Sequence, residues 1–205
     1  MSSLTRLPYH PPGRSIGLLG GSFNPAHAGH VYISTEALKR LHLDEVWWLV
    51  SPQNPLKSSA DMASFDERFN HAQSTVTDRR IKVLDIEQYL KTRFTADTLK
   101  KLRRITPGVH FVWMMGADNF AQFHQWRQWQ SIIQNTALAI FDRRPYSRAA
   151  RSSKTARIFK TAQIFDHKAN TLSTRPCPAW CFFPVRPNLL SATDIRQQRT
   201  ADSNH

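Results

Sequence analysis

A glycine pair and a histidine pair between residues 20 and 30 form the clearest chemical motif in the sequence. The segment reads Gly-Gly-Ser-Phe-Asn-Pro-Ala-His-Ala-Gly-His, and it places His27 and His30 three positions apart. Glycines let backbone N–H groups approach an anion closely, and a helix start adds unpaired N–H donors and a favourable dipole. An imidazole can donate a hydrogen bond to a phosphate oxygen in its neutral or protonated form. We therefore expect a phosphate-binding site here.

A second candidate segment stands near the end of the sequence, where Ser191 and Thr193 are followed by Arg196. Hydroxyls and N–H groups at a helix start, with a guanidinium one turn later, suit the β- and γ-phosphates of a nucleoside triphosphate. Taken alone, the same residues are an ordinary helix N-cap. Paired with the first motif, they favour a triphosphate site.

The two segments resemble the GxFxPxHxGH and [ST]-x-[ST]-x-x-R signatures of the HxGH nucleotidyltransferase superfamily. The resemblance implies a Rossmann-like fold and transfer of an adenylyl group from ATP to a phosphate-bearing acceptor. It also implies catalytic roles for His27, His30, Lys57 and Arg196. The implied ATP-binding residues are Gly20, Gly21, Ser22, Phe23, Ser191, Thr193 and Arg196.

The middle of the chain resembles the bacterial nicotinate-nucleotide adenylyltransferase family. The matching pieces are FTADTL at 94–99, GADN at 116–119, FHQW at 123–126 and FDRRP at 141–145. The resemblance implies that ATP and nicotinate mononucleotide give deamido-NAD and pyrophosphate in NAD biosynthesis. It implies Mg²⁺ bound through ATP, with no metal held by the protein itself. The implied acceptor-binding residues are Asn24, Thr95, Gly116, Asp118, Trp126 and Arg143.

Several of these residues have simpler explanations. Trp126 can be a core aromatic beside Phe123 and Trp129, Asp118 can be a helix cap, and Lys57 can be a solvated loop lysine. Two other functions also stay open. One is another enzyme of the superfamily, such as phosphopantetheine adenylyltransferase. The other is a nucleotide-sensing module that binds nucleic acid, although no helix-turn-helix, zinc-finger or RRM signature is visible.

Short apolar runs that alternate with helical patterns must position these residues. Strands are expected at 16–19, 46–50, 81–86, 111–115 and 138–141, with a last apolar run at 180–185. Helices are expected at 29–41, 95–104 and 64–76, the last with Ser64 and Glu67 in a capping box. This alternation predicts an α/β, Rossmann-like fold with a mostly parallel sheet and helices on both faces. We expect a loose leader over residues 1–14 and a single domain over 15–205.

The formal charge of +13 and the pI near 10.4 favour polyanionic partners such as nucleotides. Basic residues recur without an acid between Arg143 and Lys160, and a helix there would carry a loose basic stripe. The stripe is either a solvated surface or a phosphate contact. Cys177 and Cys181 have neither zinc nor redox spacing. With no signal-like or membrane-spanning apolar run, we expect a cytoplasmic protein, and a homo-oligomer is possible.

Overall fold

A single seven-stranded sheet organises the computed structural model, which describes residues 10–52, 62–143 and 145–185. The strand order is β3-β2-β1-β4-β5-β7-β6, and every neighbouring pair is parallel. The mostly parallel α/β sheet expected from the sequence is thereby confirmed. The strands are β1 (Ser15–Gly21), β2 (Glu45–Val50), β3 (Ile81–Leu84), β4 (His110–Gly116), β5 (Ala137–Phe141), β6 (Gln163–Ile164) and β7 (Trp180–Phe183).

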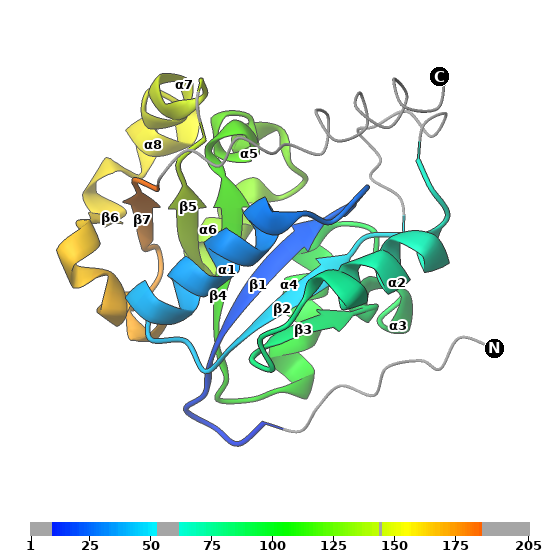
Figure 1. Ribbon diagram of the computed structural model, residues 1–205. Coiled ribbons are helices and arrows are strands. Elements are labelled where there is room, and N and C mark those ends of the chain that lie inside the picture. Colours follow the sequence, from blue (N-terminus) through cyan, green and yellow to red (C-terminus); the bar gives the residue numbers. More distant parts are fainter. Residues whose placement is uncertain (1–9, 53–61, 144, 186–205) are drawn as a thin grey trace.

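Helices cover both faces of this sheet, also as expected. In Figure 1, α1 and α2 lie in front of the strands, and α4 and α6 lie behind them. The α-helices are α1 (Ala28–Arg40), α2 (Phe65–Thr75), α3 (Ile86–Tyr89), α4 (Thr95–Ile105), α5 (Ala117–Ala121), α6 (Trp129–Asn135), α7 (Ser147–Arg151) and α8 (Lys154–Ile158). Three 3₁₀ segments complete the described fold: η1 (Phe123–Gln125), η2 (Lys160–Ala162) and η3 (Asp166–Thr174).

Two hydrophobic cores result, one on each face of the sheet. Neighbouring residues of a strand point to opposite faces, so Trp47 and Trp48 of β2 enter different cores, and both are fully buried. Leu99 of α4 packs in the core with Trp47, and Leu38 of α1 packs in the core with Trp48. Because helices cover both faces of the sheet, the strand sequences are nearly continuous runs of apolar residues.

The expected elements are found with two differences. The strand predicted to reach Ile86 ends at Leu84, and Ile86 instead begins α3. The basic segment after Arg143 forms two short helices, α7 and α8, and not one long helix with a continuous basic stripe. Arg151 of α7 places its guanidinium over the Phe182 ring, 4.5 Å from the centroid, so part of this segment packs against β7.

Residues 10–14 of the expected leader lie against the sheet. The His10 side chain is 6% exposed and lies beside Trp47, and Arg14 forms an ion pair with Asp44. Cys177 is a half-buried free thiol, and Cys181 is a buried one. None of the helices in the described ranges is long and apolar enough to cross a membrane.

Candidate active site

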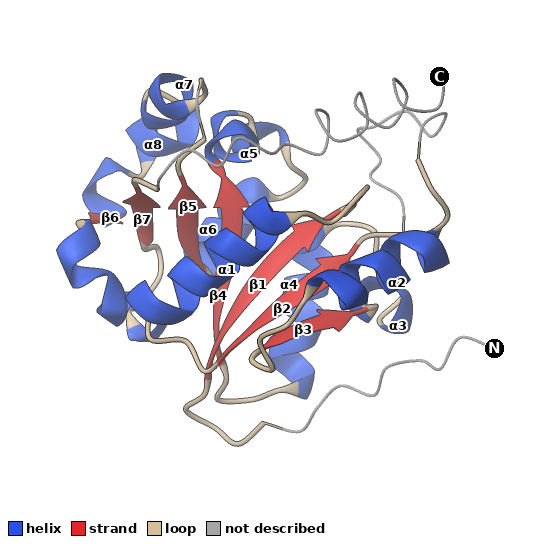
Figure 2. Ribbon diagram, viewed as in Figure 1, coloured by secondary structure: helices blue, strands red, loops and turns tan. Residues whose placement is uncertain are grey.

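The candidate site lies where the strand order changes direction. β1 and β4 are neighbours at the centre of the sheet. The strands that follow β1 in the chain, β2 and β3, lie on one side of this pair, and the strands that follow β4 lie on the other side. In doubly wound sheets, ligands bind outside the carboxyl ends of the strands at this point. Gly20 and Gly21 end β1, and Gly116 ends β4. Figure 2 shows these strand ends on the same edge of the sheet as the start of α1.

The two histidines form a hydrogen-bonded cap at the start of α1. The Nδ1 atom of His27 accepts a hydrogen bond from the Gly29 N–H at 3.1 Å, and the Nδ1 atom of His30 accepts one from the His27 N–H at 3.2 Å. The ring centroids lie 3.9 Å apart. Because each Nδ1 accepts a hydrogen bond, the neutral form of each ring carries its own proton on Nε2. Both imidazoles therefore lie at the start of the same helix.

The His27 ring is neutral near pH 7. Burial, together with a smaller effect of the positive charge of Arg143, lowers the pKa of its imidazole to about 4. A neutral ring with its proton on Nε2 can donate to a phosphate oxygen without exchanging a proton. Arg143, which follows β5, is therefore close enough to His27 for its charge to act on the ring.

Three of the expected acceptor-binding residues lie together at the ends of β4 and β5. Arg143 Nη1 donates to Asp118 Oδ2 at 3.1 Å. The other carboxylate oxygen of Asp118, Oδ1, is buried and has no hydrogen-bond partner in the described structure. A Cβ at Gly116 would overlap that oxygen, so the glycine lets the carboxylate turn back over the strand end. The cluster thus presents an unused acceptor and a guanidinium beside the histidine pair.

Thr95 and Trp126 occupy the face of the sheet behind β1. Thr95 is the first residue of α4, where Phe94 is the N-cap. The Trp126 ring contacts Phe123 with 5.3 Å between centroids and Trp113 with 6.3 Å. Trp126 therefore packs at the edge of the core, in line with the alternative that it is a core aromatic. Its side chain is nevertheless only partly buried, so some of the ring surface is exposed.

The loop between β1 and α1 places the remaining residues in different environments. Phe23 has a left-handed backbone with φ of 47°, and its ring is buried against Trp48 and His30. Any contact of Phe23 with a nucleotide would therefore come from its backbone. Ser22 and Asn24 are partly buried, and Asn24 Oδ1 accepts a hydrogen bond from the Ala63 N–H at 3.3 Å. Lys57, Ser191, Thr193 and Arg196 lie outside the described residues.

Arg68 holds this loop in place, and nothing in the sequence pointed to it. Its side chain comes from α2 and is 2% exposed. The guanidinium donates to the backbone carbonyl oxygens of Ser22, Ser51 and Pro52 at 2.6, 2.9 and 2.9 Å, and to that of Ala63 at 3.0 Å. A buried guanidinium is stable only when its donors are used. Arg68 therefore fixes the end of the glycine segment to the end of β2.

Trp113 is a second residue that the sequence did not single out. Its ring lies under Gly20, where an added Cβ would come within 2.5 Å of the Cη2 atom. Its indole Nε1 is buried and has no hydrogen-bond partner among the described residues. The Trp113 ring therefore contacts Gly20 and also packs edge-on against the Trp126 ring. A tryptophan in an apolar strand carries no sequence signal for this role.

Comparisons with known proteins decide the family. A family model described as cytidylyltransferase-like matches residues 18–198. A probable nicotinate-nucleotide adenylyltransferase of Methylorubrum extorquens is 49% identical over 181 residues, which cover 88% of this chain and 98% of that protein. This chain belongs to the nicotinate-nucleotide adenylyltransferase family. A family member from Ruegeria pomeroyi is 47% identical over 92% of this chain and 88% of its own length.

A solved structure supports the family fold. It is the Plasmodium falciparum nicotinic acid mononucleotide adenylyltransferase complexed with NaAD, with a TM-score of 0.68 over 90% of this chain and 83% of that chain. The sequence identity is 18%, so this likeness shows the Rossmann-like fold alone. The family expected from the motifs is confirmed by the relatives of similar sequence.

Proposed function

We propose that this chain transfers the adenylyl group of ATP to nicotinate mononucleotide, giving deamido-NAD and pyrophosphate. The observation that carries the proposal is the histidine pair at the start of α1, placed at the switch point of the sheet, with the neutral His27 within reach of the charge of Arg143. The names of the closely similar relatives agree with this activity.

The reaction needs positioning and charge neutralisation more than proton transfer. The 5′-phosphate of the acceptor attacks the α-phosphorus of ATP, a new P–O bond forms, and the bond to the β-phosphate breaks as pyrophosphate leaves. The attacking oxygen is already an anion, so no protein base is required. His27, His30 and the backbone N–H groups after Gly20 donate hydrogen bonds to the phosphates as negative charge builds up.

The acceptor side uses groups of a different kind. In our proposal the Trp126 ring stacks on the pyridine ring, and the first N–H groups of α4 near Thr95 bind its carboxylate. The unpartnered Oδ1 atom of Asp118 accepts a hydrogen bond from a ribose hydroxyl. Arg143 neutralises the acceptor phosphate while it stays paired with Asp118.

Mg²⁺ enters this proposal as part of the ATP complex. Within the described residues, no three His, Cys, Asp or Glu side chains are grouped so that they could hold a metal ion. The phosphate oxygens of ATP are the hard ligands that Mg²⁺ prefers. When bound, Mg²⁺ would neutralise charge on the phosphates of ATP.

Several sequence expectations stay predictions. Roles for Lys57, Ser191, Thr193 and Arg196 on the triphosphate are proposed from the family motifs alone. The single domain over residues 15–205, a cytoplasmic location and a homo-oligomer are likewise predictions from the sequence.

An acceptor panel tests the proposed function. The full chain is incubated with ATP, Mg²⁺ and one acceptor at a time, and pyrophosphate release and the dinucleotide product are followed. We expect product with nicotinate mononucleotide and none with phosphopantetheine. Product with phosphopantetheine alone would contradict the proposal and support the second enzyme of the superfamily.

A further inference from the structure

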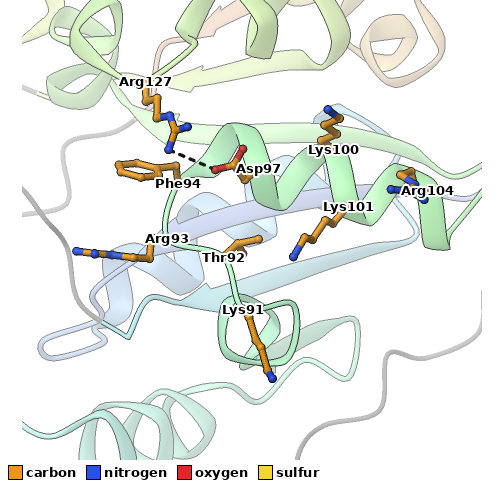
Figure 3. Close-up of a pocket in the computed structure, with 9 residues that line it drawn as sticks. All are labelled: Lys91, Thr92, Arg93, Phe94, Asp97, Lys100, Lys101, Arg104 and Arg127. Atoms are coloured by element: carbon orange, nitrogen blue, oxygen red, sulfur yellow. Dashed lines mark ion pairs between the residues drawn. The ribbon is translucent and has the colours of Figure 1, made fainter.

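A basic hollow of about 460 Å³ lies on the solvent face of α4. Figure 3 shows its side chains coming from the loop before α4, from α4 itself and from the loop after Trp126. Asp97 is the one carboxylate among the lining side chains. The six cationic side chains that line it are Lys91, Arg93, Lys100, Lys101, Arg104 and Arg127. We call this feature the α4 hollow.

Most of these cations have no counter-charge. Arg127 lies 3.8 Å from Asp97 and places its guanidinium over the Phe94 ring at 4.7 Å. Lys101 Nζ donates to the Leu90 carbonyl oxygen at 2.6 Å. The side chains of the other four cations make no hydrogen bond or ion pair in the described structure. The α4 hollow therefore concentrates positive charge that the described residues do not neutralise.

Helix stability does not account for this arrangement. Cations in the last turn of α4, such as Arg104, are favoured by the helix dipole. Arg93 and Arg127 instead lie at the start of α4, where the dipole disfavours positive charge. Lys100 and Arg104 are also four residues apart on one helix face, a spacing at which like charges repel.

We propose that the α4 hollow binds the polyphosphate chain of a small molecule, either inorganic tripolyphosphate or a free nucleoside triphosphate. Three guanidinium groups offer forked donors to phosphate oxygens, and three ammonium groups add point charges. The hollow has the size of a small-molecule site. Proteins that bind single-stranded nucleic acid stack its bases on exposed aromatic rings, and the Phe94 ring in the hollow lies under Arg127.

The α4 hollow is separate from the histidine pair. His27 and His30 belong to the start of α1, which covers one face of the sheet, and α4 covers the other face. Figure 1 shows the two helices on opposite sides of the strands. The hollow also opens on the side of α4 that faces away from the sheet, because Leu99 and Leu102 occupy the buried side.

A pair of matched double variants tests the proposal. Lys100→Gln with Arg104→Gln removes two charges from the α4 hollow. Lys154→Gln with Arg157→Gln removes the same two residue types from the exposed side of α8. Binding of inorganic tripolyphosphate to each full chain is measured by calorimetry at about 0.15 M salt, where long-range charge effects are screened. We expect binding at least about tenfold weaker in the hollow variant and unchanged in the α8 control.

Two further probes, ATP and a single-stranded RNA, identify which kind of phosphate-bearing molecule the α4 hollow binds. The same loss with ATP in place of tripolyphosphate would assign the site to a free nucleotide, and a loss with tripolyphosphate alone would assign it to the inorganic chain. Equal binding of tripolyphosphate and of ATP by the two variants would overturn the proposal. So would a larger loss for a single-stranded RNA of about 20 nucleotides than for either phosphate probe, since that result indicates a nucleic-acid surface.

Hydrogen exchange on the unmodified chain gives a measurement that does not depend on any variant. Tripolyphosphate should slow amide exchange over residues 99–104, which lie beyond the first turn of α4. Protection confined to the start of α1 and to the amides around Thr95, with none over residues 99–104, would place the ligand elsewhere and overturn the proposal.

Discussion

Replacing Gly20 with alanine should destabilise the protein, and the same change at Gly21 should not. A Cβ at position 20 would lie 2.5 Å from Cη2 and 2.8 Å from Cζ2 of Trp113. A Cβ at position 21 would meet Phe23 at 3.5 Å, which is an ordinary contact. The two glycines are neighbours in β1 and face opposite cores, so they form a matched pair.

The size of the effect follows from how far Trp113 must move. Carbon atoms in contact sit roughly 3.5–4.0 Å apart, so the indole ring must shift by about 1 Å. Trp113 is 2% exposed, and its ring lies edge-on to Trp126, so the shift has little free space. Overpacking of this kind costs about 1–3 kcal/mol in free energy of unfolding. The shift should also displace Trp126 and raise the KM for the acceptor more than the KM for ATP.

Urea denaturation of the two variants and the original chain measures this prediction. Gly20→Ala should lose about 1–3 kcal/mol, and Gly21→Ala should stay within about 0.5 kcal/mol of the original. Gly21→Ala should nevertheless lower activity, because a methyl group there hinders close approach of a phosphate to the backbone. If Gly20→Ala unfolds at the same urea concentration as Gly21→Ala, the packing of Trp113 under β1 is not as described.

Three further changes test separate parts of the structure. His30→Ala should lower kcat by about 100-fold or more in steady-state assays, and a loss below threefold would remove His30 from catalysis. Burial raises the pKa of Glu87 to about 7, above its ordinary value of 4.5. The original chain should therefore lose stability relative to Glu87→Gln as pH rises from 4.5 to 7, by up to about 3 kcal/mol, and parallel denaturation curves across that range would contradict this. Arg68→Gln should cost about 3 kcal/mol in chemical denaturation because buried carbonyl oxygens lose their donors, and a cost below 0.5 kcal/mol would show that these bonds are dispensable.

The sequence predicted the elements whose signals are local. Residues 46–50 and 111–115 are apolar runs of the length of a buried strand, and both lie in strands of the sheet. The cap of α2 was predicted from Ser64 and Glu67, whose side chains each bond the other residue's backbone N–H. The strand predicted over 81–86 was wrong at its C-terminal end. An apolar residue pattern alone does not distinguish the last residues of a strand from the first residues of the helix that follows it.

The contacts that the sequence did not predict are made between distant segments. Arg68 looks like a solvated arginine on an amphipathic helix, yet it bonds carbonyl oxygens near residues 22 and 51. The charges of the α4 hollow come from two loops and a helix, with Arg127 far along the chain from Lys91. Along the sequence, the most conspicuous basic segment is instead the acid-free one after Arg143. Patterns read along the chain do not report charges that only folding brings together.

The proposed acceptor is tested by comparing nicotinate mononucleotide with nicotinamide mononucleotide at limiting concentration and saturating ATP and Mg²⁺. N–H donors at the start of α4 should favour a carboxylate over a neutral amide, and a buried mismatch costs on the order of 1–3 kcal/mol per group. We predict that kcat/KM is at least about tenfold higher for the nicotinate form. Equal use of the two mononucleotides, or use of neither, would contradict the account.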